Sequence, residues 1–345
     1  MPTLESYFLI QKTPFLQMEN LVVPSRFTTT ESEYWAVRQG VGIFDFSFMR
    51  CLEISGAEAG LLIDQIQCRP RAELKQNRIF YTMVVNPEGL ILLDATLWRL
   101  ADDRYWLTTG KSVLDYIQSS AKSFSNVVVR DISDQFQTIA VQGPHSKKAL
   151  QGAFGLMPED LPDYFGFKQV SCLSNIITVA RLGYTGELGY ELFVPKFQAV
   201  QIWELLKNNP LVPAKECGFL AADQLRIEAG FILFVNELQQ ARRFSELGYE
   251  RFIGRDDIDP KHDFVLVGLL FQDQSSTYGS GPNQVLRKDD LVQVTSRAHS
   301  PRLHCDVGLG FIHRSQFVDG KKALTEMLEP VTIKKLPLYR HDREG

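Results

Sequence analysis

The sequence predicts an α+β protein that ends in an all-β region. Short helical patterns and strands are interspersed through the first 260 residues, and several of the strands pair around tight turns. Beyond Lys261 the pattern changes to short, spaced strands without long helices. We therefore expect antiparallel sheets with helices, followed by a small barrel or sandwich.

Helices are expected where apolar residues recur every three to four positions, at residues 31–38, 57–66, 112–122, 199–207 and 221–229, with another opening at 146–150. Strands are expected at residues 51–54, 79–85, 90–100, 105–109, 138–142, 176–182 and 189–194. Asn86-Pro87-Glu88-Gly89 supplies the turn between two of these strands. The final strands are expected at residues 265–271, 285–286, 291–295, 308–312 and 331–334.

Composition argues against several classes of partner. The 345 residues are 44% hydrophobic with a formal net charge of -4, which gives no electrostatic reason to expect nucleic acid or an anionic membrane surface. No apolar run approaches the roughly 20 residues of a membrane helix, and the first residues lack a signal-peptide pattern. The five dispersed cysteines and the six histidines lack metal-ligand spacing. We expect a cytoplasmic protein without a metal site.

Asp94 is the most informative single residue. It lies in a strand, residues 90–98, that is apolar on both faces and is therefore expected to be buried on both. An unpartnered carboxylate there would cost several kcal/mol, so it must be hydrogen-bonded, protonated or facing a polar cavity. A cavity carboxylate suits proton transfer or the orientation of an amine. A structural Asp that accepts bonds from backbone amides remains the alternative.

Glu191 raises the same question in the strand 189–194. Alternation places it on one face with Phe193, and Tyr190 and Leu192 on the other. A carboxylate on a partly apolar face could accept two parallel hydrogen bonds from an amino-pyrimidine edge. The alternative is an exposed glutamate on a one-sided sheet.

A glycine-rich turn precedes this strand. Gly183, Gly186 and Gly189 follow a G-x-x-G-x-x-G pattern rather than that of a dinucleotide-binding loop, and a strand rather than a helix comes next. We expect a tight turn that allows a ligand to approach the backbone.

Several co-linear motifs carry a family resemblance along nearly the whole chain. The most specific is Gly183-Tyr184-Thr185-Gly186-Glu187-Leu188-Gly189-Tyr190-Glu191. The others are Ala36-Val37-Arg38 with residues 41–47, Tyr81 to Asp94, Val141-Gln142-Gly143-Pro144, Leu225-Arg226-Ile227-Glu228-Ala229-Gly230, Phe252-Ile253-Gly254-Arg255, and Val294-Thr295-Ser296 with Ser300-Pro301. With them the chain resembles the glycine-cleavage T-protein (aminomethyltransferase) family and its tetrahydrofolate-dependent demethylase relatives.

The resemblance implies a cloverleaf of two interleaved α+β antiparallel-sheet domains in residues 1–260 and a β-barrel in residues 261–345, around a central folate channel. It implies a tetrahydrofolate-dependent transferase that moves a methyl or aminomethyl unit from a small donor. Asp94 matches the family's catalytic aspartate, Glu191 the glutamate that grips the pterin, and Tyr81 and Tyr184 aromatic residues of the folate site.

Departures from the T-protein pattern keep the donor open. Leu93 replaces the first residue of an Asp-Asp pair, Thr109 an asparagine, and Ala222 an arginine, whereas Asp94-x-Thr96 resembles the dimethylglycine and sarcosine enzymes. These changes weigh against a lipoylated carrier, the H-protein, as donor, although that reaction remains an alternative. A non-catalytic folate-binding protein is a further alternative, but the cysteine motif of those relatives is missing here.

Overall fold

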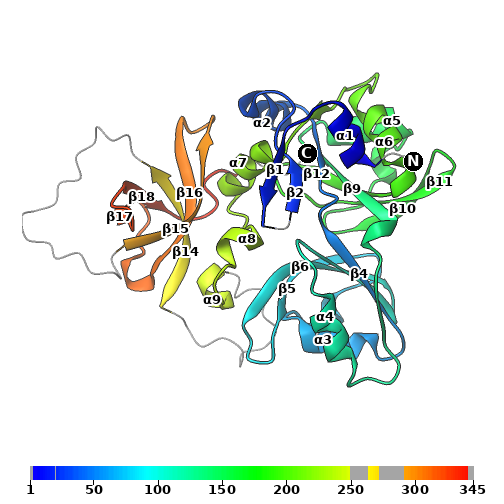
Figure 1. Cartoon of the computed structure of the whole chain (residues 1–345), viewed down its shortest axis with the longest axis horizontal. Coiled ribbons are helices and arrows are strands. Elements are labelled where there is room, and N and C mark those ends of the chain that lie inside the picture. The colour runs from blue at the N-terminus through cyan, green and yellow to red at the C-terminus, as the bar shows by residue number, and fades with distance from the viewer. Residues whose placement is uncertain (1–2, 20, 249–262, 272–290, 341–345) are drawn as a thin grey trace, which may run out of the picture.

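The computed structural model describes residues 3–19, 21–248, 263–271 and 291–340. Two α+β units, each built on one sheet, lie beside a closed five-stranded barrel (Figure 1). This arrangement confirms the predicted fold class. The 260/261 domain boundary, the Phe252–Arg255 motif and the strand expected at 285–286 lie outside the described residues, so the domain division stays a prediction.

One unit is a six-stranded sheet, antiparallel except for one short edge pair. Its order is β10 (Phe167–Cys172), β11 (Asn175–Ala180), β12 (Gly189–Pro195), β9 (Phe136–Gln142), β3 (Gly42–Asp45) and β13 (Lys215–Glu216). Its helices are α1 (Leu4–Ile10), α5 (Ser146–Phe154) and α6 (Ala199–Lys207). Their apolar sides form one core with the sheet, with Phe8 and Trp203 fully buried in it. This core covers one face of the sheet, and Glu191 lies on the opposite face.

The second unit is a five-stranded antiparallel sheet. Its order is β5 (Ile79–Val85), β6 (Ile91–Ala101), β7 (Arg104–Thr109), β4 (Arg50–Ser55) and β8 (Val128–Asp131). Helices α3 (Ala59–Ile66) and α4 (Leu114–Ala121) share its core (Figure 1). The hairpin turn after β5 is the predicted one, with Gly89 at a φ of 75° that suits glycine.

The uncovered faces of the two sheets meet through aromatic side chains. Trp98 of β6 and Phe193 of β12 are in edge-to-face contact with ring centroids 4.9 Å apart, and Trp106 of β7 packs beside them. Because side chains alternate along a strand, Asp94 and Thr96 share the face of Trp98, and Glu191 shares the face of Phe193. The interface therefore orients both candidate carboxylates toward the space between the units.

The barrel closes in the order β14 (Phe264–Phe271), β16 (Cys305–His313), β15 (Leu291–Ser300), β17 (Lys322–Thr325) and β18 (Pro330–Lys334). Helices α7 (Phe219–Ala229), α8 (Phe234–Glu237) and α9 (Phe244–Leu247) lie between it and the two sheets (Figure 1). Helix α2 (Thr30–Gln39) packs on α7. Helix α7 thus joins the barrel to the first part of the chain.

Some elements were not predicted. The missed strands include β1 (Phe15–Met18), β2 (Leu21–Pro24), β8, β10, β13 and β17. Strands β8 and β10 lie at sheet edges and expose several side chains, so their alternation is weak. Strand β15 runs five residues beyond its predicted end at 295. The prediction stopped short because most side chains in the second half of the strand are polar. In the described part of the chain, no helix has the length and apolar character needed to cross a membrane.

Candidate functional site

A cavity of about 1870 Å³ lies where the two sheets, helix α7 and the barrel meet. All four residues predicted for the site line it: Tyr81 and Asp94 from β5 and β6, Tyr184 from the glycine-rich turn, and Glu191 from β12. The structure thus brings together side chains more than a hundred positions apart in the sequence. Their chemical roles remain predictions.

Asp94 is a half-buried carboxylate on the cavity wall. The Tyr81 hydroxyl donates a hydrogen bond to its Oδ2 at 3.2 Å. Burial raises the pKa of Asp94 to about 6, while the Tyr81 bond opposes the rise and the charge of Glu237 adds to it. A carboxylate with such a pKa is mostly ionised at pH 7 and is still basic enough to accept a proton.

Glu191 lies on the central part of β12, between Ala180 of β11 and Ala140 of β9. Its residue is only 6% exposed, and burial raises the pKa of its carboxyl to about 7. Within the described ranges, no hydrogen-bond partner of this carboxylate is found. The alternative reading, an exposed glutamate on a one-sided sheet, is therefore wrong. A buried carboxyl without a partner is costly, and a ligand with N–H groups would remove that cost.

Aromatic side chains form part of the cavity wall. Tyr184 stacks on Phe231 with ring centroids 6.2 Å apart and contacts the edge of Phe46, and all three line the cavity. The Tyr184 hydroxyl donates to the Ile232 carbonyl oxygen at 2.6 Å, so this ring is held in place rather than free to act as an acid. Flat, fixed aromatic faces suit a planar heterocycle.

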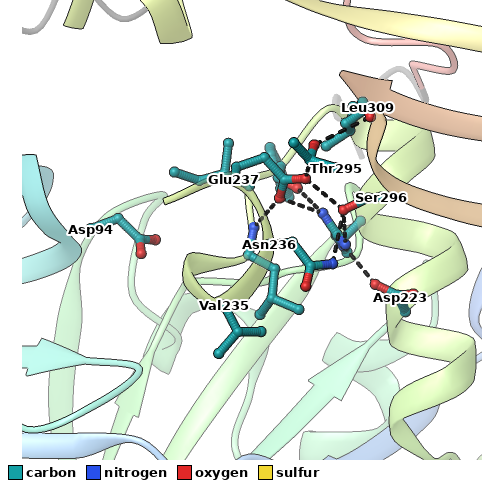
Figure 2. Close-up of polar contacts among 12 residues, drawn as sticks. Asp94, Asp223, Val235, Asn236, Glu237, Thr295, Ser296 and Leu309 are labelled. Carbon is teal, nitrogen blue, oxygen red and sulfur yellow. Dashed lines mark hydrogen bonds and ion pairs between the residues drawn. The ribbon is translucent and has the colours of Figure 1, made fainter. Parts of the chain in front are cut away.

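A buried charge network lies to one side of Asp94, whose carboxylate points toward it (Figure 2). The Arg226 guanidinium donates to Asp223 at 2.8 Å, to Glu237 at 3.0 Å and to Ser296 at 2.7 Å. Glu237 also accepts bonds from the Thr295 and Ser296 hydroxyls of the barrel and from a backbone amide. The network ties α7 and α8 to the barrel, and through Glu237 it contributes to the raised pKa of Asp94.

A second buried network uses the glutamate of the glycine-rich motif. Arg38 of α2 pairs with Glu187 at 2.6 Å and with Glu228 of α7, and Glu228 also accepts from Tyr34 and from Ser300 of the barrel. These side chains are almost fully buried. The network lies outside the cavity lining, which makes Glu187 and Arg38 structural.

Two of the residues that differ from the T-protein pattern, Thr109 and Ala222, can be located relative to the cavity. Thr109 lines the cavity, but its hydroxyl donates to the Lys111 carbonyl at 2.7 Å. Ala222 is fully buried in an apolar cluster with Phe46 and does not line the cavity. Neither position supplies a long polar side chain to a ligand.

Sequence reasoning missed two groups near the site: the Arg226–Glu237 network and the cavity threonines Thr96 and Thr108. Charges in helical segments look like solvated surface in a sequence, so Glu237 gave no signal. Thr96 gave a weak one, because it lies two positions from Asp94 and therefore on the same face. Among the residues described, no three His, Cys, Asp or Glu side chains are grouped to hold a metal ion.

The fold and the site define a class: two α+β units and a barrel around a large cavity that carries buried carboxylates and aromatic walls. Comparison with known proteins agrees. The family model described as the GCVT N-terminal domain matches residues 8–257. A curated aminomethyltransferase of Thermoanaerobacter pseudethanolicus is 33% identical over 92% of this chain and 88% of its own, and one of Streptomyces avermitilis is 30% identical over 93% and 92%.

A solved structure supports the fold. The glycine cleavage system aminomethyltransferase T from Bartonella henselae superposes with a TM-score of 0.80 at 23% identity, over 97% of this chain and 98% of that one. The chain therefore belongs to the T-protein, or aminomethyltransferase, family of enzymes.

Proposed function

We propose that this protein is a tetrahydrofolate-dependent one-carbon transferase, with Asp94 as its catalytic residue and Glu191, Tyr81 and Tyr184 as its folate-binding residues. The observation that carries the proposal is the meeting of two buried carboxyl groups in one cavity, one of which, Glu191, has no hydrogen-bond partner in the described part of the protein. Family membership gives the proposal its reaction class.

The residues fit a folate. The cavity of about 1870 Å³ exceeds the roughly 300–1,000 Å³ usual for small-molecule sites, which leaves room for a folate and a second substrate together. The Glu191 carboxyl suits the paired N–H donors of an amino-pyrimidine, and the Tyr184 and Phe231 rings suit a flat bicycle. When bound, tetrahydrofolate supplies the nitrogen that accepts the one-carbon unit.

Asp94 would hold or accept the proton released as that nitrogen reacts. Its pKa of about 6 lies close to neutral pH, where a general base is most effective. The Tyr81 hydroxyl steadies the ionised form and fixes the direction of the carboxylate. Most of the acceleration would come from holding both substrates together in one cavity.

The donor is proposed to be a small methyl or aminomethyl compound. Thr109 and Ala222 lack the side chains that the T-protein pattern places there, which favours a donor other than a lipoylated carrier protein. The relatives' name, aminomethyltransferase, favours an aminomethyl group and keeps the carrier as the second candidate. We retain the cytoplasm as the expected location, with neither nucleic acid nor membrane as partner.

Calorimetric titration with tetrahydrofolate, comparing the wild type with Glu191→Ala, tests the folate site. Saturable binding that weakens at least about tenfold in the variant is expected from loss of a charge-assisted hydrogen bond. Absence of binding to the wild type would refute the proposal.

Turnover is tested with a panel of methyl and aminomethyl donors that includes an aminomethyl-loaded lipoyl carrier. Turnover with a small donor is the expected result. Turnover with the carrier alone would overturn the preference for a small donor. Tight folate binding without turnover on any donor would identify the protein as a non-catalytic folate binder.

A further inference from the structure

A second hollow, of about 300 Å³, lies between the same two sheets. Its lining comes mainly from β4, β7 and β8 of the five-stranded sheet and from β9, β10 and β11 of the six-stranded sheet. Among the residues described, none lines both this hollow and the main cavity. Trp106 and Phe136 line it from opposite sheets, with ring centroids 5.6 Å apart. Ile176 also lines it and is 53% exposed, so the hollow offers apolar surface to a ligand.

One row of side chains on the five-stranded sheet combines aromatic surface with charge. Glu53 of β4 lies directly opposite both Trp106 of β7 and Arg130 of β8, so the three side chains share one face. The Glu53 side chain is only 12% exposed. Its Oε2 accepts bonds from Arg104 Nε at 2.8 Å and from Trp106 Nε1 at 3.3 Å. Arg104 therefore compensates the charge of Glu53 and leaves that of Arg130 uncompensated.

The charge balance of the lining favours an anion. The charged side chains that line the hollow are two arginines and one glutamate, which gives a formal charge of +1. Arg130 carries the excess, because no hydrogen bond or ion pair joins it to another residue in the described part of the chain. A planar guanidinium with all its N–H groups available suits a carboxylate, which it can bind through two parallel hydrogen bonds.

A buried hydroxyl in the same hollow lacks a partner. Thr178 of β11 is the cross-strand partner of Phe193 and is 4% exposed. It lines the hollow, and within the described ranges its hydroxyl makes no hydrogen bond. A buried hydroxyl without a partner is costly, and a ligand oxygen would remove that cost.

We propose that this hollow is a second binding site, and that its ligand is a small aromatic monocarboxylate. The Arg130 guanidinium pairs with the carboxylate, the ligand ring covers Trp106 and Phe136, and the Thr178 hydroxyl donates to a ligand oxygen. Glu53 disfavours a second carboxylate on the ligand, because its own charge lies in the same lining. This site is independent of the folate function proposed above.

The test compares two probes of the same shape, 4-hydroxyphenylacetate and the uncharged 4-hydroxyphenylacetamide. Binding is followed by NMR through the indole N–H signals of the four tryptophans. The acid should bind with a Kd of about 0.1–1 mM, a value usual for so small a ligand. It should bind at least about fivefold more tightly than the amide, as one partly exposed ion pair allows. The signal of Trp106, identified by its loss in Trp106→Phe, should move on titration.

Variants separate charge from shape. Arg130→Gln should remove the preference for the acid, whereas Arg130→Lys keeps the charge without the planar fork and should retain part of it. Thr178→Val keeps the side-chain shape and should weaken binding of the acid by about three- to tenfold. Arg26→Gln is the matched control, because Arg26 is exposed and lines neither hollow. It should keep the wild-type affinities.

Several results would overturn the inference: no saturable binding of the acid, equal affinities for acid and amide, or an Arg130→Gln variant that keeps the full preference. Saturating tetrahydrofolate should not displace the acid, because the two hollows have separate linings. Displacement would put the probe in the main cavity and would also overturn the inference, while leaving the folate function supported. A wild type that binds the acid but not tetrahydrofolate would refute the proposed function and support the second site.

Discussion

Replacing Glu191 by glutamine is expected to stabilise the protein at neutral and higher pH. The carboxyl has an ordinary pKa of 4.5, and burial raises its pKa to about 7 in the folded protein. Between these two values the folded state binds more protons than the unfolded state. The free energy of unfolding therefore falls as the pH rises from about 4.5 to about 7 and is level above that range, as far as this group is concerned.

The size of the effect follows from the two pKa values. At about 1.4 kcal/mol per pH unit, the difference between 4.5 and about 7 corresponds to a cost of about 3 kcal/mol above pH 7. Glutamine has the same shape and does not ionise. Its amide is also buried, however, and burying it lowers the free energy of unfolding by a smaller amount. We expect Glu191→Gln to gain about 1–3 kcal/mol at pH 8 and nothing at pH 4.5.

Urea unfolding followed by tryptophan fluorescence at pH 5, 6, 7 and 8 would measure this. The difference between variant and wild type should grow with pH and then level off. Glu326→Gln, at an exposed position, is the control and should show no such trend. A difference that is the same at every pH would refute the assignment of a buried, high-pKa carboxyl. Weaker tetrahydrofolate binding by the more stable variant would show that the buried charge is kept for function.

Three further predictions concern Asp94. Asp94→Asn should lower kcat by about 10²- to 10⁴-fold with folate affinity changed only a few-fold; unchanged turnover would remove its catalytic role. Tyr81→Phe removes a bond that lowers the pKa of Asp94, so the acidic limb of the kcat/KM profile, near pH 6, should move to higher pH; a shift to lower pH would contradict the geometry. Glu237→Gln removes a neighbouring negative charge, so the same limb should move to lower pH. It should also destabilise the protein by about 3–5 kcal/mol in urea unfolding, because Arg226 loses a buried partner.

The order of the main helices and strands and the two candidate carboxylates could be predicted because their signals are local, whereas Tyr81 and Tyr184 were predicted only through the family resemblance. Asp94 stands out as a charge in a run of apolar residues, and the β5–β6 hairpin is marked by its turn. The pairing of Thr108 and the burial of Glu228 could not be predicted from local signals. The pairing of Thr108 with Thr96 depends on strand register, and the burial of Glu228 depends on how α7 packs against the barrel.

The cavity wall continues beyond the stretch that defines the family's N-terminal domain. Leu266 of β14, Phe317, and residues 335–337, 339 and 340 line it, although the family match ends at residue 257. The backbone amide of Tyr339 donates to the Glu228 carbonyl at 2.9 Å and anchors that segment on α7. The residues that form the cavity therefore extend beyond the matched domain. A gene fusion that carried residues 8–257 into another protein would transfer both carboxylates without the part of the cavity wall that the barrel and the residues after it supply.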